Sequence, residues 1–136
     1  MNALHFAKVW SRLSKDLKTQ METMLAPSLT ESQLNVLEYL LNEQENPLKP
    51  SDLLGFLDTT PAAVTTLLDR MEKNELISRV RDEKDRRIVW IRVTDKGRDE
   101  CERGVQIRKE LMDRYLNRIS THNQQLLLYL LGKVAN

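Results

Sequence analysis

The stretch TPAAVTTLLDRMEK, residues 60–73, predicts a helix with two chemically different faces. Thr60 followed by Pro61 is the usual order of a helix N-cap and the first helical residue. Apolar side chains recur at helical spacing along one face, namely Val64, Leu67, Leu68 and Met71. The opposite face begins with small side chains and hydroxyl groups, so this helix can approach another surface closely.

A second helix is expected just before this stretch, and a β-hairpin just after it. Pro50 suits the first turn of a helix over about residues 50–57. Two β-rich segments follow at residues 76–81 and 88–93, and the residues between them are all charged, which predicts a solvated hairpin tip. A helix-turn-helix with a hairpin beside it suits duplex DNA, because its second helix fits the major groove.

Long helices are expected at both ends of the chain. Apolar residues at helical spacing predict a helix over residues 1–25, ended by Pro27. Thr30 and Gln33 form a capping box for the next helix, which fades in the polar residues 42–46. Two helices therefore precede the helix-turn-helix.

Two further helices are expected after the hairpin. Thr94 caps a fifth, long helix, and Thr121 with Gln124 forms the capping box of a sixth that is apolar nearly all round. Inward positions of the fifth helix alternate between spacings of four and three residues, which suits packing against another long helix. These positions are Cys101, Val105, Arg108, Met112, Tyr115 and Ile119. The predicted fold is mainly α, with the order α-α-α-α-β-β-α-α.

Composition argues against several classes of function. The 136 residues predict a single domain, residues 1–136, and the lone Cys101 excludes an internal disulfide and a cysteine-rich zinc site. The two histidines lie near opposite ends of the chain, so we expect no metal. No spacing of nucleophile and base, phosphate loop or carboxylate pair suggests an enzyme or a cofactor. Without a membrane-length apolar run or a signal-peptide pattern, the chain is expected to be cytoplasmic.

The net charge of +1 hides a strongly basic segment. Residues 79–98 carry eight basic and four acidic side chains, whereas residues 22–58 carry seven acidic side chains against Lys49 alone. A local positive patch attracts an anionic partner even when the total charge is near zero. Because the basic segment coincides with the hairpin, double-stranded DNA is the expected partner.

The outer face of the helix at residues 60–73, with the residue before it, supplies a first set of candidate DNA contacts. Hydroxyl groups can bond phosphates or bases, methyl groups can touch thymine, and a guanidinium can reach a phosphate or a guanine. The candidates are Thr59, Thr60, Ala62, Ala63, Thr65, Thr66 and Arg70.

The hairpin tip supplies a second set, which consists of Arg81, Lys84, Asp85, Arg86 and Arg87. Arg87 is expected to enter a narrow minor groove, whose negative potential favours arginine. Asp85 precedes it by two residues and can fix the guanidinium through a bidentate pair. Arg86 and Arg81 are expected to hold phosphates.

These segments resemble the winged helix-turn-helix of the MarR family, the bacterial repressors of multiple-antibiotic-resistance type. The matching motifs are AVTTLLDRMEK at residues 63–73, DRR at residues 85–87 and VTDKG at residues 93–97. With the flanking helical arms, the resemblance covers essentially the whole chain.

The resemblance implies a domain organisation and a function. A winged helix-turn-helix would occupy residues 29–97, and residues 1–26 and 98–136 would be dimerisation helices. The implied molecule is a homodimeric regulator, most simply a repressor of a pseudo-palindromic operator, with groove-reading roles on residues 59–70 and 85–87.

Many members of the family bind small, often aromatic or phenolic molecules between the dimerisation helices and the reading domain, so the resemblance implies a candidate effector site there, through which DNA binding could be released. Trp10, Leu13 and Leu17 are candidates to line the effector pocket, and the alternative is that they form dimer core.

One departure from the family pattern and two alternative interpretations remain. Glu75 stands where members of the family usually have glycine, and Asn74 is expected to take the left-handed conformation in its place. Cys101 is either a peroxide-sensing thiol, as in some members, or a buried thiol, which its inward position favours. The second hypothesis for the whole chain is a winged-helix module that binds a protein instead of DNA, which the acidic residues 22–58 support.

Overall fold

The computed structural model describes residues 1–43 and 48–136 of the chain. Its elements are α1 (Asn2–Leu25), α2 (Glu31–Asn42), a 3₁₀ turn η1 (Pro50–Asp52), α3 (Leu53–Leu57), α4 (Pro61–Lys73), β1 (Ile77–Arg81), β2 (Val89–Val93), α5 (Asp95–Leu116) and α6 (Thr121–Ala135). The predicted order of helices and strands is confirmed. The polar stretch in which α2 was expected to fade extends into residues 44–46, which lie outside the described residues.

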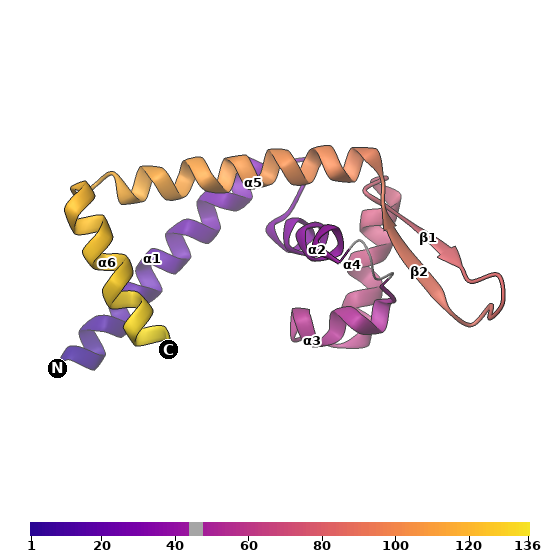
Figure 1. The fold of residues 1–136 in the computed structure, drawn as a ribbon, viewed down its shortest axis with the longest axis horizontal. Helices are drawn as coiled ribbons and strands as arrows, with labels where there is room; N and C mark the ends of the chain where they lie inside the picture. Colours follow the sequence, from indigo (N-terminus) through magenta and orange to yellow (C-terminus); the bar gives the residue numbers. More distant parts are fainter. Residues whose placement is uncertain (44–47) are drawn as a thin grey trace.

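Helix α5 forms the long axis of the molecule (Figure 1). Helices α1 and α6 lie at one end of α5 together with both chain termini, whereas α2, α3 and α4 form a lobe beneath the other end. The hairpin of β1 and β2 projects from that lobe, away from α6. We call this hairpin, residues 77–93, the wing.

The hydrophobic core lies in the lobe and supports α4 from its inner face. Leu34 of α2 and Leu68 and Met71 of α4 are completely buried. Leu25 of α1 and Leu111 of α5 are completely buried as well and belong to the same cluster. Burial of one such side chain stabilises the fold by about 1.5–3 kcal/mol. The core therefore ties α1 and α5 firmly to the lobe that carries α4.

The buried face of α5 differs from the predicted one. Its buried residues are Gly97, Cys101, Gly104 and Leu111. Val105 and Met112, which were expected to point inward, are each 38% exposed, and so is Ile119, which follows the end of the helix. Gly104 explains the shift, because Leu34 of α2 approaches so closely that a Cβ at position 104 would lie 2.7 Å from Leu34 Cδ1.

Arg108, which interrupts the predicted apolar seam of α5, has an ionic partner. Its guanidinium donates to both carboxylate oxygens of Glu38 in α2, at 2.7 and 2.6 Å. Both side chains are about one-third exposed. The pair therefore fastens α5 to α2 beside the buried Cys101.

Most of the predicted helix caps are present. Thr30 and Gln33 form their capping box, and Thr94 accepts a hydrogen bond from the Gly97 N–H. The predicted box at Thr121 is wrong, because Ser120 is the N-cap of α6. Successive hydroxyl residues stand there, and the sequence pattern did not distinguish between them.

The turn between α4 and β1 corrects a second expectation. Glu75 itself has φ 64°, whereas Asn74 has φ −83° and is not left-handed. The Glu75 N–H donates to Glu72 O at 3.0 Å, and the Leu76 N–H donates to Met71 O at 2.9 Å. These two bonds form a Schellman motif, which needs its left-handed residue one position after the C-cap.

The wing is a two-stranded antiparallel sheet with the register Ile77↔Val93 to Arg81↔Val89. Leu48 extends it by one bridge, since the Ile91 N–H donates to Leu48 O at 2.9 Å. This bridge attaches the base of the wing to the segment before α3. Within the residues that the structure describes, we find no helix with the length and apolar character needed to cross a membrane.

Candidate nucleic-acid interface

The outer face of α4 carries the first set of predicted contact residues. All seven are exposed, from Thr59 and Thr60 to Arg70. The Thr60 hydroxyl oxygen accepts a hydrogen bond from the Ala63 N–H at 3.2 Å, so Thr60 is the cap that the sequence predicted. The Thr60 hydroxyl proton remains to donate outward, next to a helix N-terminus that favours an anion such as phosphate.

The two threonines in the middle of α4 are oriented by the helix itself. Thr65 Oγ1 donates to Pro61 O at 3.0 Å, and Thr66 Oγ1 donates to Ala62 O at 3.1 Å. Because these hydroxyl protons are already bonded inside the helix, the groups left for a ligand are the oxygen lone pairs and the methyl groups. The contact chemistry of α4 is thus largely apolar and accepting, which suits thymine methyl groups and exocyclic amines.

The predicted contact residues of α4 lie on two neighbouring stripes. Thr59, Ala63, Thr66 and Arg70 line one side of a hollow of about 630 Å³, whose other wall is the end of α1 and the start of α2. The second stripe starts at Ala62 and Thr65 and continues to Asp69 and Glu72, which bond Arg79 of the wing. The same helix surface therefore borders both the hollow and the wing.

The tip of the wing is organised by Asp82, a residue that the sequence analysis did not single out. Asp82 Oδ2 accepts hydrogen bonds from the N–H groups of Lys84 and Asp85 at 3.0 and 2.8 Å, and Oδ1 accepts from Trp90 Nε1 at 3.1 Å. The bond from the Trp90 indole is the main reason that the pKa of Asp82 lies below its ordinary value. An aspartate that bonds the N–H groups two and three positions ahead is a recurrent turn signal, and it was visible in the sequence.

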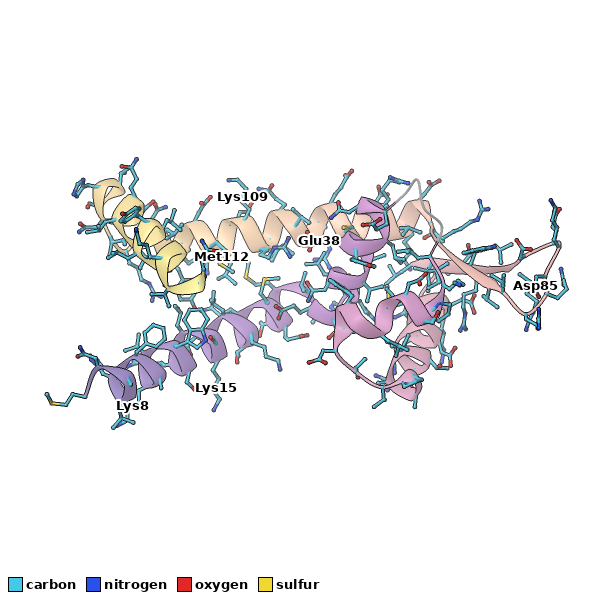
Figure 2. All side chains as sticks on the ribbon, turned by 60° about the horizontal axis from the view of Figure 1, so that its bottom comes forward. Lys8, Lys15, Glu38, Asp85, Lys109 and Met112 are labelled. Carbon is cyan, nitrogen blue, oxygen red and sulfur yellow. The ribbon has the colours of Figure 1, made fainter. Side chains whose placement is uncertain are left out.

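The predicted pair of Asp85 and Arg87 is present at this tip. Arg87 Nε and Nη2 donate to the two carboxylate oxygens of Asp85 at 3.0 and 3.1 Å, and this contact lowers the pKa of Asp85. Arg81 Nη1 donates to the Arg86 carbonyl at 2.8 Å and thereby braces the loop. Figure 2 places Asp85 at the free end of the wing, far from α1 and α6. Arg87 is thus held in one orientation, with its side chain 90% exposed.

Arg79 of β1 links the wing to α4, and the sequence analysis missed it. Arg79 Nη2 donates to Asp69 Oδ1 at 2.6 Å and to Glu72 Oε1 at 3.0 Å, and the Arg79 N–H donates to Glu72 Oε2 at 3.1 Å. The bonds from Arg79 lower the pKa of Glu72, so this carboxylate is charged at neutral pH. The available signal was the pair of acidic residues three positions apart on α4.

The candidate effector residues lie on α1, whose N-terminal part is at the opposite end of the molecule from α4 (Figure 1). Trp10 and Leu13 are exposed in the N-terminal part of α1, where the Trp10 ring stacks on Phe6 with centroids 6.2 Å apart. Leu17 is partly buried against the core. The three side chains share one apolar stripe of α1, apart from the hollow beside α4.

A helix with small exposed side chains and a projecting arginine loop, mounted on one rigid core, is an arrangement that fits neighbouring grooves of a DNA duplex. A sequence model of the MarR family matches residues 29–89. The chain is also 32% identical over 115 residues to the HTH-type transcriptional repressor MdtR of Bacillus subtilis (strain 168), a match that covers 85% of this chain and 73% of that protein. The chain belongs to the MarR family.

Solved structures agree with this MarR-family assignment. The crystallised MarR family protein from Bacillus stearothermophilus has a TM-score of 0.81 to this chain and 27% sequence identity, with 98% of this chain and 93% of that chain covered. A Staphylococcus aureus MepR–DNA complex shares the fold, with a TM-score of 0.78, 24% identity and 96% of each chain covered. As a MarR-family member the protein is a DNA-binding transcriptional regulator and not an enzyme. The first of the two hypotheses from the sequence is the one that these findings support.

Proposed function

We propose that this MarR-family regulator is a homodimeric repressor that reads a pseudo-palindromic operator with two copies of α4 and the wing. The observation that carries the proposal is the uncovered apolar surface at the other end of the molecule. Every residue of α6, all of which the structure describes, stays at least partly exposed, although the helix is rich in leucine. Leu128 and Tyr129 of α6 are 58% and 60% exposed, and Trp10 of α1 is 53% exposed.

A second copy of the chain is the occupant that this surface fits. Val105, Met112 and Ile119 leave a line of exposed apolar side chains seven residues apart along α5 and just beyond it. That repeat is the one by which long helices pack against each other. An exposed apolar surface of this extent on a single protomer is typical of a protein–protein interface. The proposed dimer therefore joins α1, α5 and α6 of one protomer to those of its partner.

The proposed DNA contacts come from both predicted sets. In the major groove, the small and hydroxyl-bearing residues of α4 meet bases and phosphates, and Arg70 meets a phosphate or a guanine. In the minor groove, Arg87 enters while Asp85 holds its orientation, and the other basic residues of the tip bind phosphates. The full set is Thr59, Thr60, Ala62, Ala63, Thr65, Thr66, Arg70, Arg81, Lys84, Asp85, Arg86 and Arg87.

Release by a small aromatic effector is a further part of the proposal, and MarR-family membership supports it. Trp10, Leu13 and Leu17 are the proposed lining, because they form an apolar stripe on α1 beside the proposed dimer contact. Tryptophan fluorescence of the parent tests this assignment, with a Trp10→Phe variant to identify the part of the signal that comes from Trp10 rather than from Trp90. Small aromatic compounds that release DNA should quench Trp10, and release without quenching would place the effector elsewhere.

Selection of bound fragments from random duplex DNA tests the proposed function. A recovered inverted repeat with half-sites about 34–36 Å apart is the expected result, because each half-site meets one reading unit of a two-fold symmetric dimer. Recovery of single, unrepeated sites would refute the proposed dimer reading. Titration of the selected duplex at two salt concentrations should show an affinity that falls steeply with salt.

Repression itself is tested with a reporter gene whose promoter overlaps the selected operator. MdtR, the relative that is 32% identical, is a repressor, which supports the same direction of control here. Expression of the chain should lower the reporter signal. A rise in the signal would identify an activator.

A further inference from the structure

We propose that Arg79 of β1 is a positioning residue that holds α4 and the wing as one rigid unit for reading DNA. The proposal rests on the proposed function, because it requires α4 and the wing to contact the same duplex. Its basis is a double attachment to α4. The Arg79 side chain bonds Asp69 and Glu72, and the Arg79 backbone N–H bonds Glu72 as well. A change of rotamer at Arg79 therefore leaves one of the attachments intact.

The wing is also held at two points on the β2 side. Thr94 Oγ1 donates to the Glu75 carbonyl at 2.6 Å, and the Ile91 N–H donates to Leu48 O at 2.9 Å. Neither of these bonds reaches α4. Arg79, which pairs with Ile91 across the sheet, fixes β1 to α4 itself and so helps to define the angle between the hairpin and that helix. The angle decides whether the tip meets the minor groove when α4 occupies the major groove.

The charges on α4 give a second reason for the link. Asp69 and Glu72 lie on the exposed side of a helix that approaches phosphates, where unpaired carboxylates would repel DNA. Arg79 pairs with both of them. Its side chain is only 26% exposed, compared with 90% for Arg87, so Arg79 faces the helix while Arg87 faces the solvent. Arg79 and Arg87 thus have different tasks.

A double-mutant cycle with Arg87 tests the positioning role. In the parent protein, Arg87→Ala should weaken operator binding about 5- to 150-fold, as expected for loss of an arginine contact to DNA. Arg79→Met removes the side-chain bonds to Asp69 and Glu72 and leaves the backbone bond, so the wing tip is held less firmly at the groove and Arg87→Ala should weaken binding by a clearly smaller factor than in the parent. Additive effects of the two substitutions would overturn the proposal and would make Arg79 an independent contact.

Glu72→Ala gives a test that does not depend on Arg87. Removing a negative charge from a DNA-reading helix should strengthen binding if only charge matters. If Glu72 serves to anchor Arg79, its removal should instead weaken binding by about 5-fold or more. Glu83→Ala, at an exposed acidic residue of the wing tip, measures the pure charge effect and should bind as tightly as the parent or more tightly.

One control separates the positioning role of Arg79 from a general loss of fold. Arg103→Met removes the same charge and breaks a comparable set of bonds, to Leu25 O and to the side chains of Ser28 and Glu100, far from the wing. It should leave operator affinity within about 2-fold of the parent. An equal loss in Arg103→Met and Arg79→Met would overturn the proposal.

The outcomes for the two proposals are distinguishable. If Arg87→Ala has no effect in the parent, the proposed minor-groove contact fails, and Glu72→Ala then decides the role of Arg79 alone. Glu72→Ala that binds as tightly as Glu83→Ala would overturn that role. Thermal unfolding and solution mass of each variant, measured at one protein concentration, show whether a lost affinity reflects a lost fold.

Discussion

Glu75 is a residue with a side chain at a backbone position that glycine occupies more easily. Its φ of 64° is imposed by the two hydrogen bonds that end α4. A residue with a Cβ is strained in this region, and glycine is not. Glu75→Gly is therefore expected to raise the free energy of unfolding by about 0.5–1 kcal/mol, after allowance for the greater freedom of glycine in the unfolded chain.

Urea unfolding at a fixed protein concentration measures this effect. Asn74→Gly is the matched control, because Asn74 has φ −83° and gains no relief from glycine. It should lower the free energy of unfolding. A Glu75→Gly variant that is less stable than the parent would show that the Glu75 side chain makes contacts that outweigh the backbone strain.

Cys101 is a second residue whose chemistry follows from its surroundings. It is 6% exposed, and burial together with the nearby Glu38 raises the pKa of its thiol. Because the thiolate is the reactive form, such a thiol is inert in the folded protein. We expect a thiol reagent at pH 7.5 to label Cys101 only as denaturant unfolds the chain. Rapid labelling in buffer, before any loss of helical signal, would revive the peroxide-sensing alternative.

At the scale of elements, the start of α5 is fitted closely to the turn after α4. A Cβ at Gly97 would overlap the Leu76 carbonyl oxygen and would lie 2.9 Å from Val93 Cγ1. Backbone cannot yield as a flexible side chain can, so Gly97→Ala is expected to destabilise the protein by about 2 kcal/mol or more. Gly55→Ala, where a Cβ meets open space, should instead gain about 0.5–1 kcal/mol from helix propensity.

Urea unfolding should show a lower free energy of unfolding for Gly97→Ala and a higher one for Gly55→Ala than for the parent. Gly97→Ala keeps the backbone N–H that donates to Thr94 Oγ1, so the comparison isolates the steric effect. Equal stability of the Gly97→Ala variant and the parent would mean that α5 can move away from the turn.

The helices and strands themselves were predictable from local signals, whereas the face of α5 that is buried was not. Thr60 and Thr94 mark helix starts that capping chemistry defines within a few residues, and each strand begins one residue later than predicted and ends where predicted. Cys101 is buried as predicted, but beyond it the buried face of α5 was predicted one residue out of phase, at Val105 and Met112 in place of Gly104 and Leu111. The reason is that Gly104 has no side chain to enter a hydrophobic pattern. Its role became apparent only beside Leu34, which lies seventy residues away in the sequence.

The candidate site shows the same division between local and distant information. The pair of Asp85 and Arg87 spans two residues, and sequence reasoning found it. The link from Arg79 to Asp69 and Glu72 depends on how the first part of β1 lies against α4, and a pattern along the chain does not contain that geometry. The predicted hydroxyl donors Thr65 and Thr66 are bonded within their own helix. A threonine inside a helix can donate to the carbonyl four residues before it, so the sequence could have suggested these bonds.

The whole molecule has its reading elements at one end of α5 and its uncovered apolar helices at the other. The buried core lies in the lobe and includes no residue of α6, a helix that is described in full. A substitution on the outer side of α6 should therefore separate two protomers without unfolding the lobe. Leu128→Glu places a charge in the proposed interface, where it would be desolvated at a cost of several kcal/mol.

Sedimentation equilibrium is expected to give twice 15.9 kDa for the parent protein and 15.9 kDa for Leu128→Glu. Asn123→Glu introduces the same charge at an exposed polar position of α6 and should remain a dimer. Because two linked reading units bind with a high effective local concentration, the monomeric variant should lose about 100-fold or more in affinity for a two-half-site operator. Its affinity for a single half-site should equal that of the Asn123→Glu control, since α4 and the wing are unchanged. A Leu128→Glu protein that stays dimeric would place the interface on another face of the chain.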